Sequence, residues 1–165
     1  MNKGICFLDI DGTVNIINIE YKDGRFDIRF LYPNDNKVNN KQGLLWLSKL
    51  CIEHNLDIII ISSWSSICSI EKLSEILYNS GLVDKIKIIG KVGRGDRNIE
   101  INKILKENPN IKDNYIIVDD EDFYAEEPTL KKHLILCNSN YGFGSDKYYE
   151  ARELLKTKEK TKVLK

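Results

Sequence analysis

Two apolar runs of this sequence each end in a pair of acidic residues. The first runs into Asp9 and Asp11, and the second, much later in the chain, runs into Asp119 and Asp120. Two like charges about 4 Å apart repel by about 4 kcal/mol at an effective dielectric of 20, so carboxylates that meet need a neutralising cation. Oxygen ligands without histidine favour Mg²⁺, which binds one or two carboxylates together with a substrate phosphate. If the fold brings the two pairs together, the sequence predicts a Mg²⁺ site.

The acidic pairs can meet if the runs that carry them are parallel strands of one sheet. Apolar runs alternate with helical periods along the chain, which is typical of βαβ units with right-handed crossovers. We predict strands at residues 5–8, 56–61, 86–89, 115–118 and 134–137. We predict helices at residues 41–54, 69–80 and 147–156, and another that begins after Asp96 and ends before Pro109. The predicted fold class is α/β: a three-layer, Rossmann-like fold whose mostly parallel sheet has helices on both faces.

The carboxyl ends of these strands are the expected place for a site, because open α/β sheets bind ligands there. Four consecutive isoleucines, residues 58–61, suit a strand that is buried on both faces, and Ser62 and Ser63 follow them. The sequence therefore places hydroxyl groups at the same edge of the sheet as the acidic pairs.

One insertion follows the first predicted strand. Apolar and polar residues alternate on both sides of Asp23-Gly24, and Asp-Gly between alternating runs is a strong signal for a hairpin. We predict a β-hairpin flap at about residues 15–32 and a polar loop at residues 33–40.

Composition narrows the class of protein. The 165 residues include 25 basic and 25 acidic side chains, so no global charge points to nucleic acid or membrane as a partner. The four cysteines form no C-x-x-C pair, which is typical of buried thiols in a reducing compartment. No run approaches the roughly 20 apolar residues of a membrane helix. We expect one cytoplasmic domain over residues 1–165, with no membrane partner and a solvated, lysine-rich tail at residues 156–165. The sequence does not indicate an oligomeric state.

The motifs and their order resemble the haloacid dehalogenase (HAD) superfamily of phosphotransferases. Its first motif is an apolar strand followed by Asp-x-Asp-x-Thr, here residues 9–13, and its second is a strand that ends in Ser or Thr, here Ser62. Its third motif is a Lys or Arg near the start of a helix. Its fourth is an apolar strand that ends in acidic residues, here Asp119-Asp120. The resemblance covers about residues 4–138.

The resemblance implies a role for each residue of the first two motifs. Asp9 would be the nucleophile and would form an aspartyl-phosphate. Asp11 would protonate the leaving oxygen and then activate water. Thr13 would orient the nucleophile's loop and Ser62 would hydrogen-bond the transferred phosphoryl group, so both belong to the implied phosphate-binding set.

The implied cofactor is Mg²⁺. By resemblance, its ligands would be Asp9, the backbone carbonyl of Asp11, and Asp120. Asp119 and Asp122 would add acidic support around the metal.

The third motif has three candidates in this sequence, Lys91, Arg94 and Arg97. We favour Arg97 for phosphate binding because it stands at a predicted helix start, where its guanidinium and the backbone amides can face one phosphate. Lys91 and Arg94 remain alternatives.

A narrower resemblance bears on the substrate. Ser62-Ser63-Trp64, Arg97-x-x-Glu100-Ile101 and the stretch 118–123 are similar to the small HAD domains of "Swiss Army knife" RNA-repair proteins. The hairpin is the only cap, and a nearly capless site resembles family members that accept large substrates. We expect a phosphomonoester hydrolase that acts on a 5′ or 3′ phosphate end of RNA or DNA. The alternatives are a small-molecule or nucleotide phosphatase and a non-catalytic phosphate-binding module. For Trp64, a packed lid over the strand end is favoured over a platform for base stacking.

Overall fold

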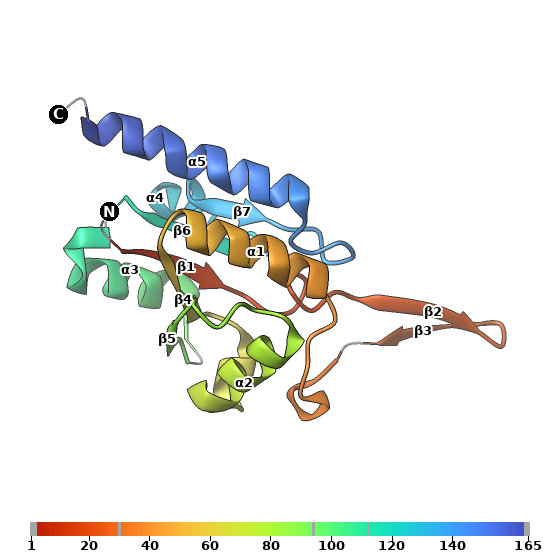
Figure 1. Cartoon of the computed structure of the whole chain (residues 1–165). Helices are drawn as coiled ribbons and strands as arrows, with labels where there is room; N and C mark the ends of the chain where they lie inside the picture. The colour runs from red at the N-terminus through yellow and green to blue at the C-terminus, as the bar shows by residue number, and fades with distance from the viewer. Residues whose placement is uncertain (1–2, 30, 94, 112, 164–165) are drawn as a thin grey trace.

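Five parallel strands form the central sheet of the structure, a computed structural model that describes residues 3–29, 31–93, 95–111 and 113–163. The strands are β1 (Gly4–Leu8), β4 (Leu56–Ile60), β5 (Ile88–Lys91), β6 (Tyr115–Asp119) and β7 (Leu134–Leu136), in the spatial order β5-β4-β1-β6-β7 (Figure 1). Every neighbouring pair is parallel. The predicted α/β sheet is confirmed. Its strand order reverses between β1 and β6, and open α/β sheets bind ligands at such a point.

Both faces of the sheet are covered by helices. The helices are α1 (Lys41–Glu53), α2 (Ile70–Ser80), α3 (Arg97–Glu107), α4 (Pro128–Lys131) and α5 (Ser145–Val163). Cys6 and Leu8 of β1 pack into a cluster with residues of α1, α2 and α5. Ile5 and Phe7 point to the other face and pack with residues of α3 and α4. This alternation produces the predicted three layers and explains why β1, β4 and β6 are buried along their whole length.

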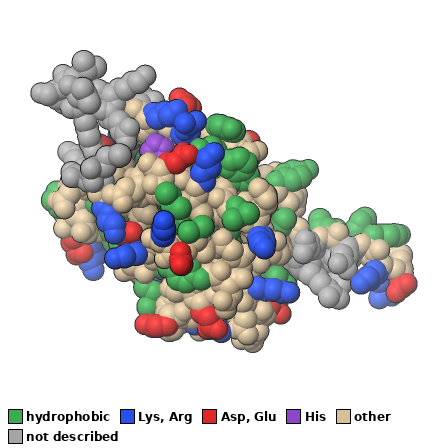
Figure 2. Space-filling view, in the orientation of Figure 1, with side chains coloured by type: hydrophobic (Ala, Val, Ile, Leu, Met, Phe, Trp, Pro, Cys, Tyr) green, Lys and Arg blue, Asp and Glu red, His purple; other side chains and the backbone are tan. Residues whose placement is uncertain are grey.

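The predicted hairpin is present and projects from the body of the protein (Figure 1). Its strands are β2 (Asn18–Lys22) and β3 (Arg25–Arg29). Asp23 and Gly24 have φ angles of 51° and 78°, and a two-residue hairpin turn requires such positive values. Tyr21 and Phe26 pair across the strands with ring centroids 5.1 Å apart, and both are exposed. Figure 2 shows hydrophobic side chains along one side of the hairpin and charged ones at its end.

The C-terminal helix is longer than predicted. It begins at Ser145, and the lysine-rich segment, which we expected to be a disordered tail, continues the helix as far as Val163. Residues 164–165 lie outside the described part of the chain. Lysine, glutamate and leucine are strong helix formers, and ion pairs three residues apart, such as Lys156 with Glu153, support the helix surface. Neither α5 nor any other described helix is long and apolar enough to cross a membrane.

Smaller elements connect the strands and helices. The short 3₁₀ turns are η1 (Pro33–Asp35), η2 (Ser63–Ser66) and η3 (Pro109–Ile111). Strand β5 begins at Ile88, two residues later than predicted, because the N–H of Ile86 donates to the carbonyl of Val83 in a turn.

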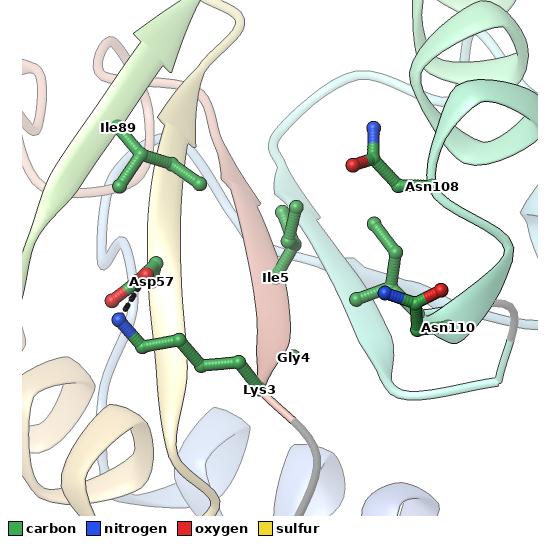
Figure 3. Close-up of a pocket in the computed structure, with 8 residues that line it drawn as sticks. Lys3, Gly4, Ile5, Asp57, Ile89, Asn108 and Asn110 are labelled. Atoms are coloured by element: carbon green, nitrogen blue, oxygen red, sulfur yellow. Dashed lines mark ion pairs between the residues drawn. The ribbon is translucent and has the colours of Figure 1, made fainter.

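A pocket of about 240 Å³ lies at the amino ends of β1 and β4. Lys3, Asp57 and Asn108 are among its lining residues, and Nζ of Lys3 lies 2.6 Å from the Asp57 carboxylate (Figure 3). Because it lies at the opposite end of the strands from Asp9, this pocket is separate from the acidic pairs.

Candidate active site

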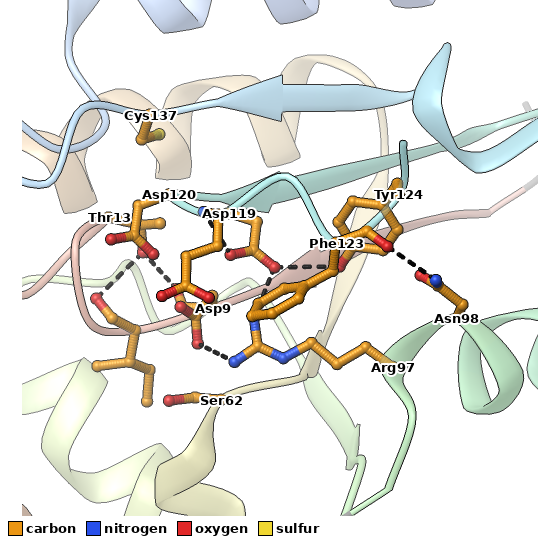
Figure 4. Close-up of polar contacts among 12 residues, drawn as sticks. Asp9, Thr13, Ser62, Arg97, Asn98, Asp119, Asp120, Phe123, Tyr124 and Cys137 are labelled. Carbon is orange, nitrogen blue, oxygen red and sulfur yellow. Dashed lines mark hydrogen bonds and ion pairs between the residues drawn. The ribbon is translucent and has the colours of Figure 1, made fainter. Parts of the chain in front are cut away.

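The carboxyl ends of three neighbouring strands bring the predicted polar residues together. Asp9 follows β1, Ser62 follows β4 by two residues, and Asp119 is the last residue of β6. Leu8 of β1 pairs with residues of both β4 and β6, so these ends are level. Carboxylate oxygens of Asp9, Asp119 and Asp120 lie within 4.8 Å of one another (Figure 4). Asp9 of the first acidic pair therefore meets both members of the second pair.

The loop after β1 approaches Asp120 closely at Gly12. This residue has φ of 73°, and a Cβ added to it would lie 2.0 Å from Oδ2 of Asp120. Only glycine combines this backbone conformation with such a close approach. Oδ2 of Asp120 also accepts a hydrogen bond from the Ser139 hydroxyl at 2.8 Å. Gly12 and Ser139 thus set the position of the Asp120 carboxylate.

Thr13 holds the loop after β1 from within. Its buried hydroxyl is hydrogen-bonded to the backbone carbonyl of Asp9 and lies 3.1 Å from the carbonyl of Ile10. These contacts are compatible with the predicted loop-orienting role of Thr13, which stays a prediction. Its contact with a phosphate stays a prediction.

Asp11 is held by two side-chain donors. Nδ2 of Asn15 donates to Oδ1 of Asp11 at 2.7 Å, and the indole N–H of Trp64 donates to Oδ2 at 2.9 Å. Burial raises the pKa of Asp11 above its usual value, and these two hydrogen bonds act in the opposite direction. The same Asn15 amide donates to the backbone carbonyl of Leu31 at 3.0 Å, so it joins Asp11 to the segment after the hairpin.

Trp64 is a packed residue. It is 3% exposed and belongs to the core cluster beneath α1 and α2, so its ring is not a platform for base stacking. The favoured prediction of a packed lid is confirmed. The hydrogen bond from Trp64 to Asp11 was not predicted from the sequence. The position of Trp64 two residues after Ser62, at the end of the same strand, could have indicated that its side chain lies near the site.

Arg97, one of the two third-motif candidates that the structure describes, reaches the carboxylates. It is the first residue of α3, which Asp96 caps by accepting from the N–H of Asn98 at 2.9 Å. Its guanidinium donates to Oδ2 of Asp119 at 2.7 Å and to Oδ1 of Asp9 at 3.4 Å.

Of the other two candidates of this motif, the structure describes Lys91. Nζ of Lys91 instead donates to the carbonyls of Ser65 and Cys68, at 2.7 and 2.5 Å. Arg94 lies outside the described residues. Of the two described candidates, Arg97 is thus the one beside the carboxylates, and its binding of phosphate stays a prediction.

Asp119 organises the site through protein contacts. Besides Arg97, its Oδ2 accepts from the hydroxyl of Tyr124 at 3.0 Å, and its Oδ1 accepts from the N–H of Glu121 at 3.1 Å. Burial raises the pKa of Asp119, whereas Arg97 lowers it. Because protein groups engage both oxygens of Asp119, Asp9 and Asp120 are the carboxylates better placed to bind a metal.

Asp122 was expected to add acidic support around the metal. Its carboxylate forms an ion pair with Lys131 of α4, and it is not part of the acidic group formed by Asp9, Asp119 and Asp120. The side chain of Asp11 is also outside that group. This does not bear on the predicted metal contact of Asp11, which was through its backbone carbonyl. The sequence spacing of Asp122 did not reveal that its loop turns toward Lys131.

The electrostatics of Asp9 favour a bound cation. Asp9 is 4% exposed, and this burial raises its pKa to about 8, although Arg97 opposes the shift. The charges of Asp119 and Asp120 contribute to this rise in the pKa of Asp9. Three buried or half-buried carboxylates beside one guanidinium leave an excess of negative charge, and they offer only hard oxygen ligands. This donor set fits Mg²⁺.

Ser62 follows β4, the strand that pairs with β1, so it lies at the same edge of the sheet as Asp9 (Figure 4). It is 3% exposed and caps η2, where its Oγ accepts weakly from the N–H of Trp64 at 3.4 Å. Such a long contact leaves the hydroxyl able to reorient, so the predicted hydrogen bond to a phosphoryl group is compatible with this geometry.

Comparison with known proteins agrees with the geometry of this site. A family model described as "HAD domain in Swiss Army Knife RNA repair proteins" matches residues 5–148. No curated protein and no solved structure matches the chain. The matched range contains both acidic pairs, Ser62 and Arg97, and it extends over most of the chain. The protein therefore belongs to the family of HAD domains found in Swiss Army knife RNA-repair proteins.

Proposed function

We propose that this protein is a Mg²⁺-dependent phosphomonoester hydrolase that acts through an aspartyl-phosphate on Asp9. The observation that carries this proposal is the grouping of Asp9, Asp119 and Asp120 around one point, with Arg97 3.4 Å from Asp9. Phosphoryl transfer depends mainly on positioning and on stabilising charge at the phosphoryl oxygens, and this arrangement supplies both.

In the first half of the proposed reaction, a carboxylate oxygen of Asp9 attacks phosphorus. The bond from phosphorus to the leaving oxygen breaks, and that oxygen takes a proton from Asp11. In the second half, water attacks the phosphorus of the aspartyl-phosphate and gives its proton to Asp11. The bond from phosphorus to Asp9 then breaks, which releases inorganic phosphate and restores both carboxyl groups. The raised pKa of Asp11 supports its first role, because it increases the protonated fraction.

Asp9, the backbone carbonyl of Asp11, and Asp120 would hold Mg²⁺. When bound, Mg²⁺ supplies positive charge that offsets the charge of the carboxylates and of the substrate phosphate. Arg97 holds Asp119 and reaches Asp9, so it can bind phosphoryl oxygens on the nucleophile's side.

The favoured substrate is a 5′ or 3′ phosphate end of RNA or DNA. Among the described residues, the hairpin β2–β3 is the only insertion after β1 that could cover the site, and an open site suits a large substrate that itself excludes water. The description of the matching family, HAD domains in RNA-repair proteins, supports the same class. A small-molecule or nucleotide phosphatase and a non-catalytic phosphate-binding module are the alternatives.

Phosphate release from a panel of esters tests this proposal. The panel contains 5′- and 3′-phosphorylated RNA and DNA oligonucleotides, nucleoside monophosphates and sugar phosphates, each with Mg²⁺ and with a chelator. We expect oligonucleotides to be the best substrates. Activity should vanish with the chelator and fall by about 10³-fold or more in Asp9→Asn. Asp122→Asn is the matched control, because Asp122 pairs with Lys131 outside the acidic group, and it should keep wild-type activity.

Other results would select an alternative. Faster turnover of mononucleotides or sugar phosphates than of oligonucleotides would identify a small-molecule phosphatase. If the folded protein releases no phosphate from any ester with Mg²⁺ present, the hydrolase proposal is wrong. Binding of a phosphorylated oligonucleotide without release would then identify a phosphate-binding module.

A further inference from the structure

A cavity of about 340 Å³ adjoins the candidate active site on the side of α3. The described residues that line it are Gly95, Asp96, Arg97, Asn98 and Phe123. Arg97 lines this cavity and also contacts Asp9, so the cavity lies next to the proposed nucleophile. A group esterified to a phosphate at Asp9 could therefore extend into it.

One of the lining residues is Phe123. Its ring is large, apolar and 48% exposed, although it lies beside a buried polar site. The guanidinium carbon of Arg97 lies 4.9 Å from the ring centroid, and Figure 4 shows the ring against the Arg97 side chain, with Asp9 at the far end of the guanidinium. Nδ2 of Asn98 donates to the backbone carbonyl of Phe123 at 2.8 Å and holds this loop against α3. The ring is thus anchored at its backbone while much of its surface stays open.

We propose that this cavity binds the nucleobase next to the scissile phosphate by stacking it against Phe123. This inference rests on the proposed function, because it assumes that the phosphate lies at Asp9. A planar base suits an aromatic ring backed by a guanidinium, since both groups stack with π systems, and stacking accepts any base. Ligand pockets usually span about 300–1,000 Å³, so a cavity at the lower end of this range fits one base.

A purely structural role for Phe123 is the competing explanation. The ring contacts Arg97, so its removal could displace the guanidinium from Asp9 and Asp119. The two roles differ in substrate dependence. Loss of stacking weakens binding of esters that carry a base and leaves glycerol phosphate unaffected, whereas displacement of Arg97 impairs every phosphate ester.

The experiment compares wild type, Phe123→Ala and Phe123→Trp, with Phe26→Ala as a matched control. Phe26 is an exposed phenylalanine on the hairpin and is not a lining residue of the cavity. With adenosine 5′- and 3′-monophosphate, Phe123→Ala should raise KM about 5- to 100-fold. The kcat/KM for glycerol phosphate should change less than about twofold. Phe123→Trp should retain tight nucleotide binding, and Phe26→Ala should match wild type.

Binding measured in the Asp9→Asn background separates failure of this inference from failure of the proposed function, because it requires no turnover. In calorimetry with Mg²⁺ present, adenosine monophosphate should bind Asp9→Asn more tightly than Asp9→Asn/Phe123→Ala. Equal affinities would overturn the stacking proposal, whatever the wild-type activity. Equal losses for the nucleotides and for glycerol phosphate would overturn it in favour of the structural role. A nucleotide-specific loss in Phe26→Ala, without one in Phe123→Ala, would place the base on the hairpin.

Discussion

The indole N–H of Trp64 donates a hydrogen bond to Oδ2 of Asp11 at 2.9 Å, which links a buried core residue to the proposed acid and base. Asp11 follows β1, and Trp64 lies in η2 just beyond the end of β4. Because these strands are neighbours, the ring can pack in the core while its polar edge reaches the site. Together with Asn15, Trp64 fixes both oxygens of Asp11.

Removing the indole N–H of Trp64 should slow the hydrolysis of esters whose leaving oxygen must take a proton from Asp11. Trp64→Phe retains an aromatic ring but loses the N–H, so Asp11 becomes less well oriented. Hydrogen bonds to charged groups contribute about 1.5–3 kcal/mol, and we expect turnover of alkyl phosphates or nucleic-acid ends to fall about 10- to 100-fold. The phosphorylation step with p-nitrophenyl phosphate should change little, because its leaving group needs no proton. Stopped-flow measurement of nitrophenol release checks this difference.

The other tryptophan provides a control for this variant. Trp46 of α1 packs against Tyr148, with ring centroids 5.1 Å apart, so Trp46→Phe should leave both rates unchanged. Equal slowing of both substrate types in Trp64→Phe would mean that the ring supports the site in general and does not specifically orient Asp11.

Without Mg²⁺, the free energy of unfolding should fall as the pH rises. The pKa of Asp9 is raised from 3.8 to about 8 by burial, so between these values the folded state binds more protons than the unfolded state. Stability then decreases with pH by at most about 1.4 kcal/mol per pH unit for this one group. Asp11 and Asp119 are shifted in the same direction and add to the trend. Urea unfolding across this pH range measures the slope.

Asp9→Asn identifies the part of this slope that belongs to Asp9. The variant should have a shallower dependence on pH than wild type and should be the more stable protein near pH 8. Mg²⁺ should raise the melting temperature of wild type more at pH 8 than at pH 5, because the cation binds the ionised carboxylates. Identical slopes for wild type and Asp9→Asn would contradict the raised pKa.

Substitution of Gly12 should disrupt the metal site. In Gly12→Ala, the new Cβ would lie 2.0 Å from Oδ2 of Asp120, so the loop or the carboxylate must move. We expect destabilisation by more than about 1 kcal/mol and loss of Mg²⁺-dependent activity. The shift in melting temperature on adding Mg²⁺ and the rate of phosphate release measure the two effects.

Substitution of Gly24 is a control that distinguishes the effect of backbone strain from the effect of the close approach between Gly12 and Asp120. The φ of 78° at Gly24 is similar to that of Gly12, but an added Cβ would meet nothing within 4 Å. Gly24→Ala should therefore cost only the roughly 1–2 kcal/mol of a left-handed backbone and should keep its response to Mg²⁺. If Gly12→Ala retains a wild-type response to Mg²⁺, Asp120 does not need its present position.

Arg97 and Lys91 should differ strongly in their effect on activity. Arg97→Ala leaves Asp119 buried without its guanidinium partner and removes a cation beside Asp9, so we expect turnover to fall about 10²-fold or more. Lys91→Ala removes contacts to two loop carbonyls and should retain near-native turnover. Steady-state kinetics of both variants test the assignment, and the reverse pattern would move the third motif to Lys91.

The local pattern of the sequence determined the sheet, the hairpin turn and the acidic strand ends. Runs of isoleucine indicate a strand buried on both faces, and Asp23-Gly24 suits a turn with positive φ angles, because both features depend on neighbouring residues. Once the strands are parallel, their carboxyl ends must meet at one edge. The sequence therefore predicted that Asp9, Asp119 and Asp120 lie at the same edge of the sheet, and the neighbouring positions of β1 and β6 bring them together.

Only the tertiary structure decided which side chains meet at that edge. Arg97 reaches Asp119 because α3 begins at that residue, whereas Lys91 is directed to the loop after β4. Trp64 meets Asp11 across 53 positions of sequence, and Asp122 turns away to Lys131. Sequence spacing places residues on elements, but the direction of a side chain depends on strand register, loop path and the packing of residues far apart in the chain.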